Sequence, residues 1–367
     1  MTSWFAASMA GAHMTEGEAL DGATLRFGAF DSLDEIGGRN WNNLLERSAT
    51  KTVFQTSEWF SSWKQTYGKS ADVLIPFAYL GDRLVAACAF INANGMFSFA
   101  AADRADYLDL LLDQQINPEL QLECLQGILG QVRSSCREFK YLKLDRVPAD
   151  STTIELLMQL SPEFYAVCTD RIPAPRMSME VVADRVNKKS LKRHAKGLGR
   201  LGCVEFNTYT RPEDVLPRLN AFFQLHVERW ASTEYPSLFL NAENRAFYVE
   251  LTRRLATTGM LRYSELNLDT KLIAAHYGFF SSARFIWYKP AFDVSLAKHS
   301  PGEVLLRNLL LLAKDEAAEV FDFTIGGEAF KYRFATDDPT VSCYYITGSR
   351  VKAGVKSTIA SVRKMLR

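Results

Sequence analysis

The segment of residues 272–334 constrains the fold of this chain most, because its predicted elements follow one another without a gap. Its consecutive runs read LIAAHYGFF, RFIWYKPAFDV, VLLRNLLLLAKDEA and VFDFTIG, followed by the basic and aromatic GGEAFKYRF. Runs rich in aromatic and β-branched residues predict strands, whereas apolar residues three and four positions apart predict a helix. The segment therefore predicts a strand, a hairpin, a second strand, a loop, a helix, a third strand and a short helix. This order places the chain in the α/β (α+β) class.

Length and composition predict a globular protein of two domains. The chain has 367 residues, more than the roughly 250–300 at which a single hydrophobic core stops growing. Hydrophobic residues make up 47% and charged residues 23%, which is ordinary for globular proteins. The 43 Lys and Arg nearly balance the 42 Asp and Glu, so any attraction to nucleic acid or to an anionic membrane must come from local patches.

Cysteine usage and hydropathy predict a cytoplasmic protein. The six cysteines lie far apart, form no CxxC pair and have no histidine at zinc spacing, so we interpret them as reduced thiols and expect no metal. No run approaches the roughly 20 apolar residues of a membrane span. The first residues, MTSWFAASMAGAHMTEGEAL, lack the basic region and the sustained apolar core of a signal peptide, so we do not expect export.

The order of predicted elements returns in the second half of the chain, which indicates a duplication. Helices, a strand pair, an amphipathic helix and a further strand occur in both halves, and LVAA of residues 84–87 matches LIAA of residues 272–275. The predicted organisation is a flexible tail over 1–22, an N-terminal domain over 23–170, a linker over 171–184, a C-terminal domain over 185–349 and a basic tail over 350–367.

Several spaced motifs of the second half resemble the BioF2-like (Acetyltransf_6) group of GNAT N-acyltransferases, which is related to the FemAB aminoacyltransferases. The residues that carry the resemblance are Leu225, His226, Arg229 and Trp230; Ile273 and Ala274; Ala291, Phe292 and Asp293; Ser300, Pro301, Gly302, Leu305 and Leu306; Phe321, Asp322, Phe323 and Gly326; and Lys331 with Phe334. The resemblance implies tandem GNAT-like domains, each with a mixed, mostly antiparallel sheet flanked by helices. It also implies transfer of an acyl or aminoacyl group to an amine by direct attack, without a covalent enzyme intermediate.

The loop KHSPG, before the leucine-rich helix, is the predicted donor site. Free backbone N–H groups and the dipole at a helix start favour the phosphates of a donor, and the family position favours the same loop. The residues assigned to donor binding are Lys298, Ser300, Pro301 and Gly302, with Arg333 nearby. An ordinary capping box, in which Ser300 caps the helix and pairs with Glu303, is the alternative.

Four residues are predicted to take part in the chemistry. Lys331 matches a FemAB lysine that faces the transfer site, and a cation there would stabilise the carbonyl oxygen as it becomes negative or contact a donor phosphate. His276 is a predicted base because histidine titrates near neutral pH. Asp293 is predicted to orient or deprotonate the acceptor amine, and Tyr288 to protonate a leaving thiolate. The structural alternatives are a solvated cation, a core hydrogen bond, a turn-forming aspartate and a core aromatic ring, respectively.

Two basic segments are candidate contacts with partners. The run of residues 184–196, DRVNKKSLKRHAK, would hold a polyanionic donor such as coenzyme A, an acyl-carrier protein or a tRNA acceptor stem, or it is a solvated face. The C-terminal SRVKAGVKSTIASVRKMLR, as a helix, pairs basic residues with Val355, Ile359 and Val362. That pattern predicts weak docking to an anionic membrane surface, with a disordered solubilising tail as the alternative.

The function predicted from these features is N-acyl transfer. The donor is acyl-CoA or acyl-carrier protein, and the acceptor is an amine of a small molecule, an amino sugar or a cell-envelope or exopolysaccharide precursor. The expected protein is a cytoplasmic monomer, with peripheral contact at the inner face of the cell membrane left open. One alternative is a FemAB-like transferase that uses aminoacyl-tRNA and a peptidoglycan-type acceptor. The other is a non-catalytic scaffold of an envelope-polysaccharide assembly.

Overall fold

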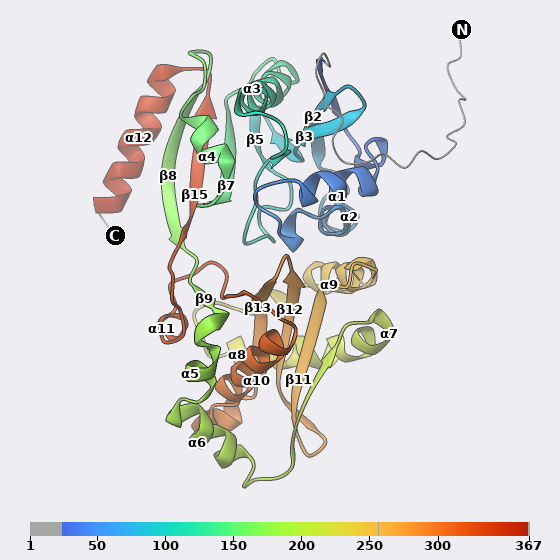
Figure 1. Cartoon of the computed structure of the whole chain (residues 1–367), viewed down its shortest axis with the longest axis vertical. Helices are drawn as coiled ribbons and strands as arrows, with labels where there is room; N and C mark the ends of the chain where they lie inside the picture. Colours follow the sequence, from blue (N-terminus) through green and yellow to red (C-terminus); the bar gives the residue numbers. More distant parts are fainter. Residues whose placement is uncertain (1–23, 256, 366–367) are drawn as a thin grey trace.

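The protein consists of two α/β halves stacked along its long axis (Figure 1). The structure, a computed structural model, describes residues 24–255 and 257–365. The tail predicted for residues 1–22 and the last two residues of the basic tail lie outside this range. Within the described residues, no helix is long and apolar enough to cross a membrane.

The N-terminal half is built on a nine-stranded sheet in the described part of the chain. The elements of this half are β1 Leu25–Phe30, α1 Gly38–Glu46, α2 Ser57–Thr66, β2 Asp72–Leu80, β3 Arg83–Ala87, β4 Phe90–Ala93, β5 Met96–Phe99, β6 Leu111–Leu112, α3 Pro118–Ser134, β7 Tyr141–Pro148, α4 Thr152–Leu157 and β8 Tyr165–Pro173. The strand order is β6-β3-β2-β4-β5-β7-β15-β8, with β1 paired to β2.

The C-terminal half is built on a six-stranded sheet of the order β10-β11-β12-β13-β14-β9. The remaining elements are β9 Arg176–Ser178, α5 Val182–Val186, α6 Lys189–Leu198, β10 Val204–Tyr209, α7 Pro212–Val215, α8 Leu219–Trp230, α9 Ala242–Leu255, β11 Leu261–Leu268, β12 Lys271–Ser281, β13 Arg284–Phe292, α10 Pro301–Asp315, β14 Val320–Asp322, α11 Ala329–Tyr332, β15 Thr340–Thr347 and α12 Arg350–Met365. Helices α5, α6 and α10 cover one face of this sheet, and α8 and α9 cover the other.

The predicted fold class is confirmed. Both sheets are mostly antiparallel, and each contains a parallel pair: β5 with β7, and β13 with β14. A helix crosses between the strands of each pair, α3 in the first half and α10 in the second. Helix α10 forms as predicted because its apolar residues, among them Leu305, Leu309 and Ala313, share one face that is buried against the sheet.

The last strand of the chain belongs to the first sheet, although the sequence prediction placed it in the C-terminal domain of residues 185–349. Strand β15 pairs antiparallel with β7 on one side and β8 on the other. Conversely, β9, from the predicted linker of residues 171–184, joins the edge of the second sheet. The chain therefore crosses between the halves twice, and Ala174 N–H donates to Pro339 O at 2.8 Å where the two crossings run side by side. An alternating pattern predicts a strand but not the sheet that it joins.

Aromatic side chains fill the contact between the two halves. Trp59 of α2 lies 5.3 Å from Phe247 of α9 and 5.9 Å from Phe279 of β12, measured between ring centroids. Phe54 lies 5.3 Å from Tyr288 of β13. Because these rings are buried, the hydrophobic core is continuous across the two halves.

Three local features do not follow from simple sequence patterns. Ser32, rather than the neighbouring Asp31, caps a short 3-10 helix, and Gly37 precedes α1. The apolar run RLVAACAF forms two strands instead of one, because β3 and β4 pair with different parts of β2. Strand β10 was not predicted, since its exposed and half-buried residues give only a weak hydrophobic pattern.

Phe279→Ala should lower the free energy of unfolding by about 3–5 kcal/mol, because it leaves a cavity in the aromatic contact between the halves. The measurement is urea unfolding followed by tryptophan fluorescence and far-UV circular dichroism, with Leu240→Ala, at a side chain that is 63% exposed, as control. A loss below about 1 kcal/mol would show that this contact does not stabilise the protein.

Candidate functional site

Strands β13 and β14 separate soon after they meet, which opens the second sheet. They pair only from Arg284 to Ile286 on β13, opposite Val320 to Asp322 on β14. Strand β13 then continues to Phe292, whereas the chain beyond β14 turns away at Thr324, whose φ is 58°. A β-branched residue at positive φ is strained, and such strain concentrates at functional sites. We call the opening between residues 287–292 and residues 323–326 the splay.

The loop predicted to bind the donor leads from β13 into α10. Ser300 has a left-handed backbone (φ 50°), and its side chain makes no capping hydrogen bond, so the alternative capping box does not form. Glu303 instead pairs with His194 of α6, at 3.0 Å, and with Arg333. The structure thus brings Arg333 to the loop that contains Ser300, Pro301 and Gly302, while Lys298 is exposed on the same loop. The negative charge of Glu303 is therefore paired with the guanidinium of Arg333.

Arg229 adds a cation to this loop that the sequence prediction did not select. Its guanidinium lies 4.4 Å from the ring of Phe292, and a Cβ at position 302 would approach that ring to 2.9 Å. Burial lowers the pKa of Arg229, and among the described residues it has no carboxylate partner. The motif LHVERW, which carries part of the family resemblance, was the available signal for this residue.

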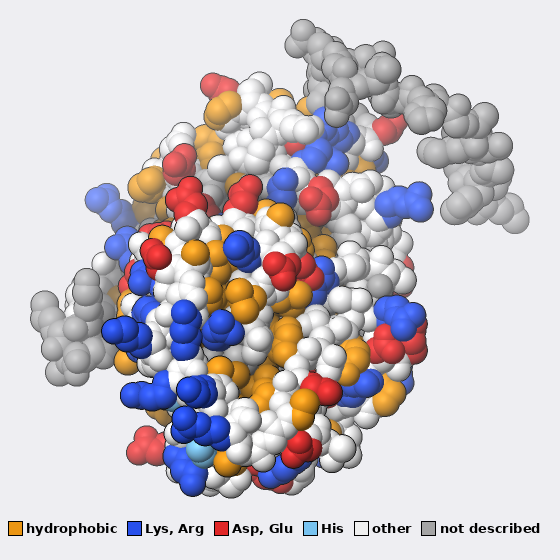
Figure 2. All heavy atoms as spheres, turned by 60° about the horizontal axis from the view of Figure 1, so that its bottom comes forward, with side chains coloured by type: hydrophobic (Ala, Val, Ile, Leu, Met, Phe, Trp, Pro, Cys, Tyr) orange, Lys and Arg blue, Asp and Glu red, His pale blue; other side chains and the backbone are white. Residues whose placement is uncertain are grey.

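Helix α6 places the predicted basic run beside this loop. It packs on α10 through Leu191 and Leu198, which are buried. The side chains of Lys189, Lys192, Arg193 and Lys196 are exposed. Figure 2 shows Lys and Arg side chains gathered on one side of this face of the molecule, next to a strip of hydrophobic side chains. The exposed cations of the basic run therefore lie on a helix that packs beside α10.

Lys331 lies at the inner end of the splay and is 3% exposed. Its Nζ donates to Ile325 O at 2.7 Å and to Thr324 O at 3.2 Å, and it forms an ion pair with Glu328 at 2.9 Å. The predicted alternative of a solvated cation is wrong, because the ammonium is buried and holds the strained turn. A catalytic role of Lys331 stays a prediction.

His276 and Tyr288 lie on opposite faces of the second sheet. His276 stacks on Trp287 at 4.8 Å, and its Nε2 accepts the N–H of Tyr288 at 3.1 Å. A bulge at Gly278 makes room for this imidazole, since any Cβ there would overlap it. Burial lowers the pKa of His276 to about 3. Its predicted role as a base stays a prediction, but Nε2 is engaged by a backbone N–H and Nδ1 is buried without a partner among the described residues.

The Tyr288 hydroxyl donates to Arg104 O in the N-terminal half at 2.6 Å, and burial raises the pKa of Tyr288. Asp293 lies at the far end of β13, where it accepts hydrogen bonds from Lys271 at 2.6 Å and from Ser295 N–H at 2.8 Å. Partial burial raises the pKa of Asp293, but these hydrogen bonds outweigh burial and lower it overall. The four predicted catalytic residues therefore do not form one cluster.

Lys289 is the residue of β13 that the sequence prediction passed over. Its Nζ lies 3.8 Å from the ring centre of Tyr288 and has no hydrogen-bond or ion-pair partner among the described residues. Burial lowers the pKa of Lys289, and Arg146, Arg104 and Lys331 also lower it, whereas Asp106 raises it. A lysine inside a strand, between Tyr and Pro in WYKP, was the signal, since such a position seldom leaves the charge in water. Lys289 is thus a partly desolvated cation, unpaired, at the border between the halves.

His226 of α8 lies within electrostatic reach of Lys289. Its Nδ1 is 2.8 Å from Ser237 Oγ. Burial, reinforced by Lys289 and Arg229, lowers the pKa of His226 to about 3. The imidazole is therefore neutral at ordinary pH, so it does not add to the positive charge of Lys289 and Arg229.

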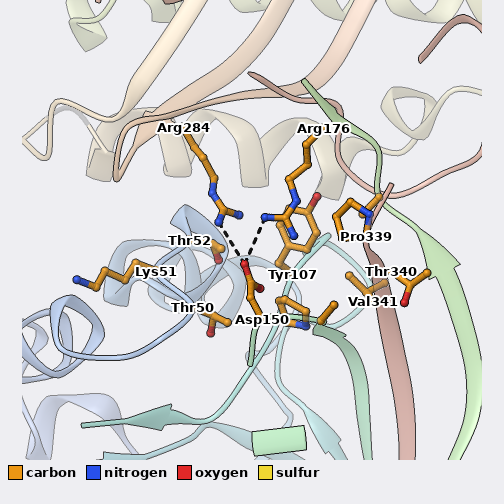
Figure 3. A pocket seen from close by; sticks show the side chains of 13 residues that line it. Thr50, Lys51, Thr52, Tyr107, Asp150, Arg176, Arg284, Pro339, Thr340 and Val341 are labelled. Atoms are coloured by element: carbon orange, nitrogen blue, oxygen red, sulfur yellow. Dashed lines mark hydrogen bonds and ion pairs between the residues drawn. The ribbon is translucent and has the colours of Figure 1, made fainter. Parts of the chain in front are cut away.

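A polar network closes the base of the splay (Figure 3). Asp150 of the N-terminal half accepts from Arg176 and Arg284, both at 3.3 Å. Tyr107 donates to Asp322 at 2.6 Å, and Arg284 lies 3.7 Å from the same carboxylate. The pocket among these residues, about 20 Å³, has room for roughly one water molecule. The network therefore links the two halves by hydrogen bonds and ion pairs.

A metal site is not formed by the described residues, which contain no group of three or more His, Cys, Asp or Glu side chains positioned to hold an ion.

Comparisons with known proteins connect this geometry to a family. Residues 185–332 match the family described as "Acetyltransferase (GNAT) domain". The fold resembles that of FemX, with a TM-score of 0.60 and 8% identity over 87% of this chain and 98% of that one. It also resembles L-PGS from Bacillus licheniformis, with a TM-score of 0.58 and 9% identity over 90% and 96%. No match was found among curated proteins. At these identities, the solved structures establish a shared fold.

The C-terminal domain of a putative lysylphosphatidylglycerol synthetase from Agrobacterium fabrum shares this fold as well, with a TM-score of 0.55 and 11% identity over 88% of this chain and 96% of that one.

The two buried histidines should make the protein sensitive to acid. Their folded-state pKa values of about 3 lie below the ordinary 6.5, so below pH 6.5 the unfolded chain binds protons that the folded protein does not. Stability is therefore fully present above pH 6.5 and is lost as the pH falls toward 3, by about 2.7 kcal/mol per histidine at pH 4.5. Urea unfolding of the wild type and of His226→Gln at pH 7.5 and 4.5 measures this, and an equal acid loss in both would contradict it.

Proposed function

We propose that this protein moves an acyl group from a thioester carrier to an amine, because residues 185–332 match the acetyltransferase (GNAT) domain family. The carrier is acyl-CoA or an acyl-carrier protein. The acceptor class is an amine of a small molecule, an amino sugar or a cell-envelope or exopolysaccharide precursor.

The observation that carries the proposal is the splay next to the cationic start of α10. An extended thioester arm bound along residues 287–292 of β13 would present hydrogen-bonding groups to backbone that β14 leaves unpaired. Its phosphates would lie at the start of α10, where the helix dipole, Arg229 and Arg333 all favour negative charge.

In the proposed reaction, the acceptor amine attacks the thioester carbonyl and a tetrahedral intermediate collapses with loss of the thiolate. Lys289 is the cation that contacts the developing oxyanion, because its Nζ is partly desolvated and has no competing ion pair. Lys331 keeps the turn of residues 324–326 in place through its two carbonyl contacts, so its role is positioning. The amine proton passes to water or to the leaving thiolate, since burial disfavours protonation of His276 and Asp293 is paired with Lys271.

Aminoacyl transfer from tRNA is the second candidate. The exposed cationic side chains of α6, Lys189, Lys192, Arg193 and Lys196, favour it because they extend the donor site into a surface suited to a polynucleotide. The likeness to FemX and to the putative lysylphosphatidylglycerol synthetase also supports aminoacyl transfer, because the second name denotes the formation of a lysyl compound.

The first test is a thermal-shift titration with coenzyme A, acyl-coenzyme A of several lengths, and tRNA, at low and moderate salt. A ligand at 100 times its dissociation constant stabilises by about 2.7 kcal/mol, so the midpoint should rise by at least about 2 °C. A salt-resistant shift with acyl-coenzyme A supports the thioester donor, whereas a salt-sensitive shift with tRNA alone supports the second candidate. No shift with any donor would favour the non-catalytic scaffold.

Lys289→Ala should lower kcat at least about 100-fold, because it removes a donor to the oxyanion. The melting temperature should stay within about 2 °C of the wild type or rise, since the lysine is partly desolvated and has no ion-pair partner. Lys69→Ala, at an exposed lysine of the N-terminal half, is the matched control. An unchanged kcat with a folded Lys289→Ala protein would rule out the assigned role.

Lys192→Glu/Lys196→Glu distinguishes the two donors. If tRNA is the donor, its dissociation constant should rise and the slope of its logarithm against log salt should fall by about 1–2, because two phosphate contacts are lost. Binding of acyl-coenzyme A at 0.3 M salt should change by less than about threefold. Equal tRNA affinity and salt slope in the variant and in the wild type would exclude α6 as a tRNA surface.

A further inference from the structure

Helix α12 carries an exposed apolar stripe on the N-terminal half, away from the splay (Figure 1). The side chains of Val351, Val355, Ile359 and Val362 are 77%, 55%, 44% and 49% exposed. Their spacing of four, four and three residues puts them on one face of the helix, over a length of about 16 Å. A contiguous apolar stripe of this kind marks an interaction surface rather than scattered apolar exposure.

The opposite side of α12 is already occupied. The helix packs on β8 and β15, where Ala353 is buried. The ammonium of Lys356 lies 4.2 Å from the ring centre of Tyr345 and 5.0 Å from that of Tyr141. The helix is thereby fixed to the sheet with its apolar stripe turned outward.

Two neighbouring hollows accompany the stripe. One, of about 350 Å³, lies between α12 and the strands, and its apolar lining of Val351, Val355, Tyr141 and Tyr345 is bordered by Lys140, Lys352 and Lys356. The other, of about 570 Å³, lies at the start of α12 and is lined by Arg133, Arg137, Lys140 and Lys352. An apolar trough thus continues into a cationic hollow.

The charged residues around the stripe are mostly basic. Residues 349–367 contain no Asp or Glu. Near the cationic hollow, Glu163 lies 3.9 Å from Arg133, and Glu138 occupies the adjacent loop. Arg137, Lys140 and Lys352 have no ion-pair partner among the described residues. An occupant of this surface must therefore supply both apolar contact and negative charge.

We propose that α12 and the two hollows form a docking surface for an anionic phospholipid bilayer. The stripe enters the boundary between headgroups and acyl chains, and the lipid phosphates lie against Lys140, Lys352 and their neighbours. A second copy of the chain fits less well, because pairing two α12 stripes would bring two rows of lysines together without an acid between them. The surface would place the transferase at a membrane through α12.

The test is sedimentation of the full chain with vesicles of 70% phosphatidylcholine and 30% phosphatidylglycerol, against pure phosphatidylcholine vesicles. The protein should bind the anionic vesicles at least about tenfold more tightly at 50 mM salt, and 0.5 M salt should weaken this binding. Val355→Asp/Ile359→Asp should lower binding at least about tenfold, and Lys140→Glu/Lys352→Glu at least about fivefold.

Matched controls use exposed side chains elsewhere on the N-terminal half. Met158→Asp, at a side chain that is 78% exposed, and Lys69→Glu should each leave vesicle binding within twofold of the wild type. All variants change exposed residues, and circular dichroism verifies their folding. Failure to sediment with anionic vesicles overturns the proposal. So does wild-type binding by both α12 variants, or a dimer in light scattering that Val355→Asp/Ile359→Asp dissociates.

Discussion

The hydrogen bond from Tyr107 to Asp322 is the interaction on which the arrangement of the site depends. Asp322 is the last residue of β14, it is 1% exposed, and its Oδ1 also accepts the N–H of Thr324 at 2.8 Å. Burial raises the pKa of this carboxyl group, while Tyr107 and Arg284 act in the opposite direction. Asp322 therefore lies where the parallel pairing ends. Its carboxylate holds the strained turn at Thr324 and joins the two halves through Tyr107. Loss of its partners would leave a buried carboxylate uncompensated, which is strongly destabilising.

The double crossing of the chain makes this network possible. Because β15 returns to the first sheet, residues 173–176 and 337–340 run side by side beneath the splay. Arg176, on one of these crossings, reaches Asp150 of the N-terminal half. The N-terminal half is thus part of the framework of the site, and through the Tyr288 hydroxyl it also contacts the strand that carries Lys289. Cations from α8 and from the segment after α11 then collect at the start of α10, where an anionic donor is favoured.

Much of the fold followed from local patterns, whereas the site followed only in part. Helices such as α3 and α10 and the strands β12 and β13 were predictable because apolar spacing and turn residues fix them locally. The placement of β15 in the first sheet was not predictable, since the pairing of a strand depends on partners that are distant in sequence. The start of α10 was predictable from Ser300 and Pro301, whereas donor binding at this loop stays a prediction. The state of Lys289 was not predictable, because its pKa is lowered by burial and by the charges of Arg146 and Arg104, which are far away in sequence. The burial of the His276 imidazole depends on the bulge at Gly278. The hydrophobic periodicity of the sequence does not predict this bulge.

Hydrogen–deuterium exchange with and without acyl-coenzyme A tests the central claim most directly, because it locates the donor without an acceptor. Donor binding in the splay predicts slower exchange in residues 287–304 and 323–334, with little change in β2 to β4 of the N-terminal half. Protection confined to the N-terminal half, or no change at saturating acyl-coenzyme A, would contradict the assignment of the splay as the thioester donor site.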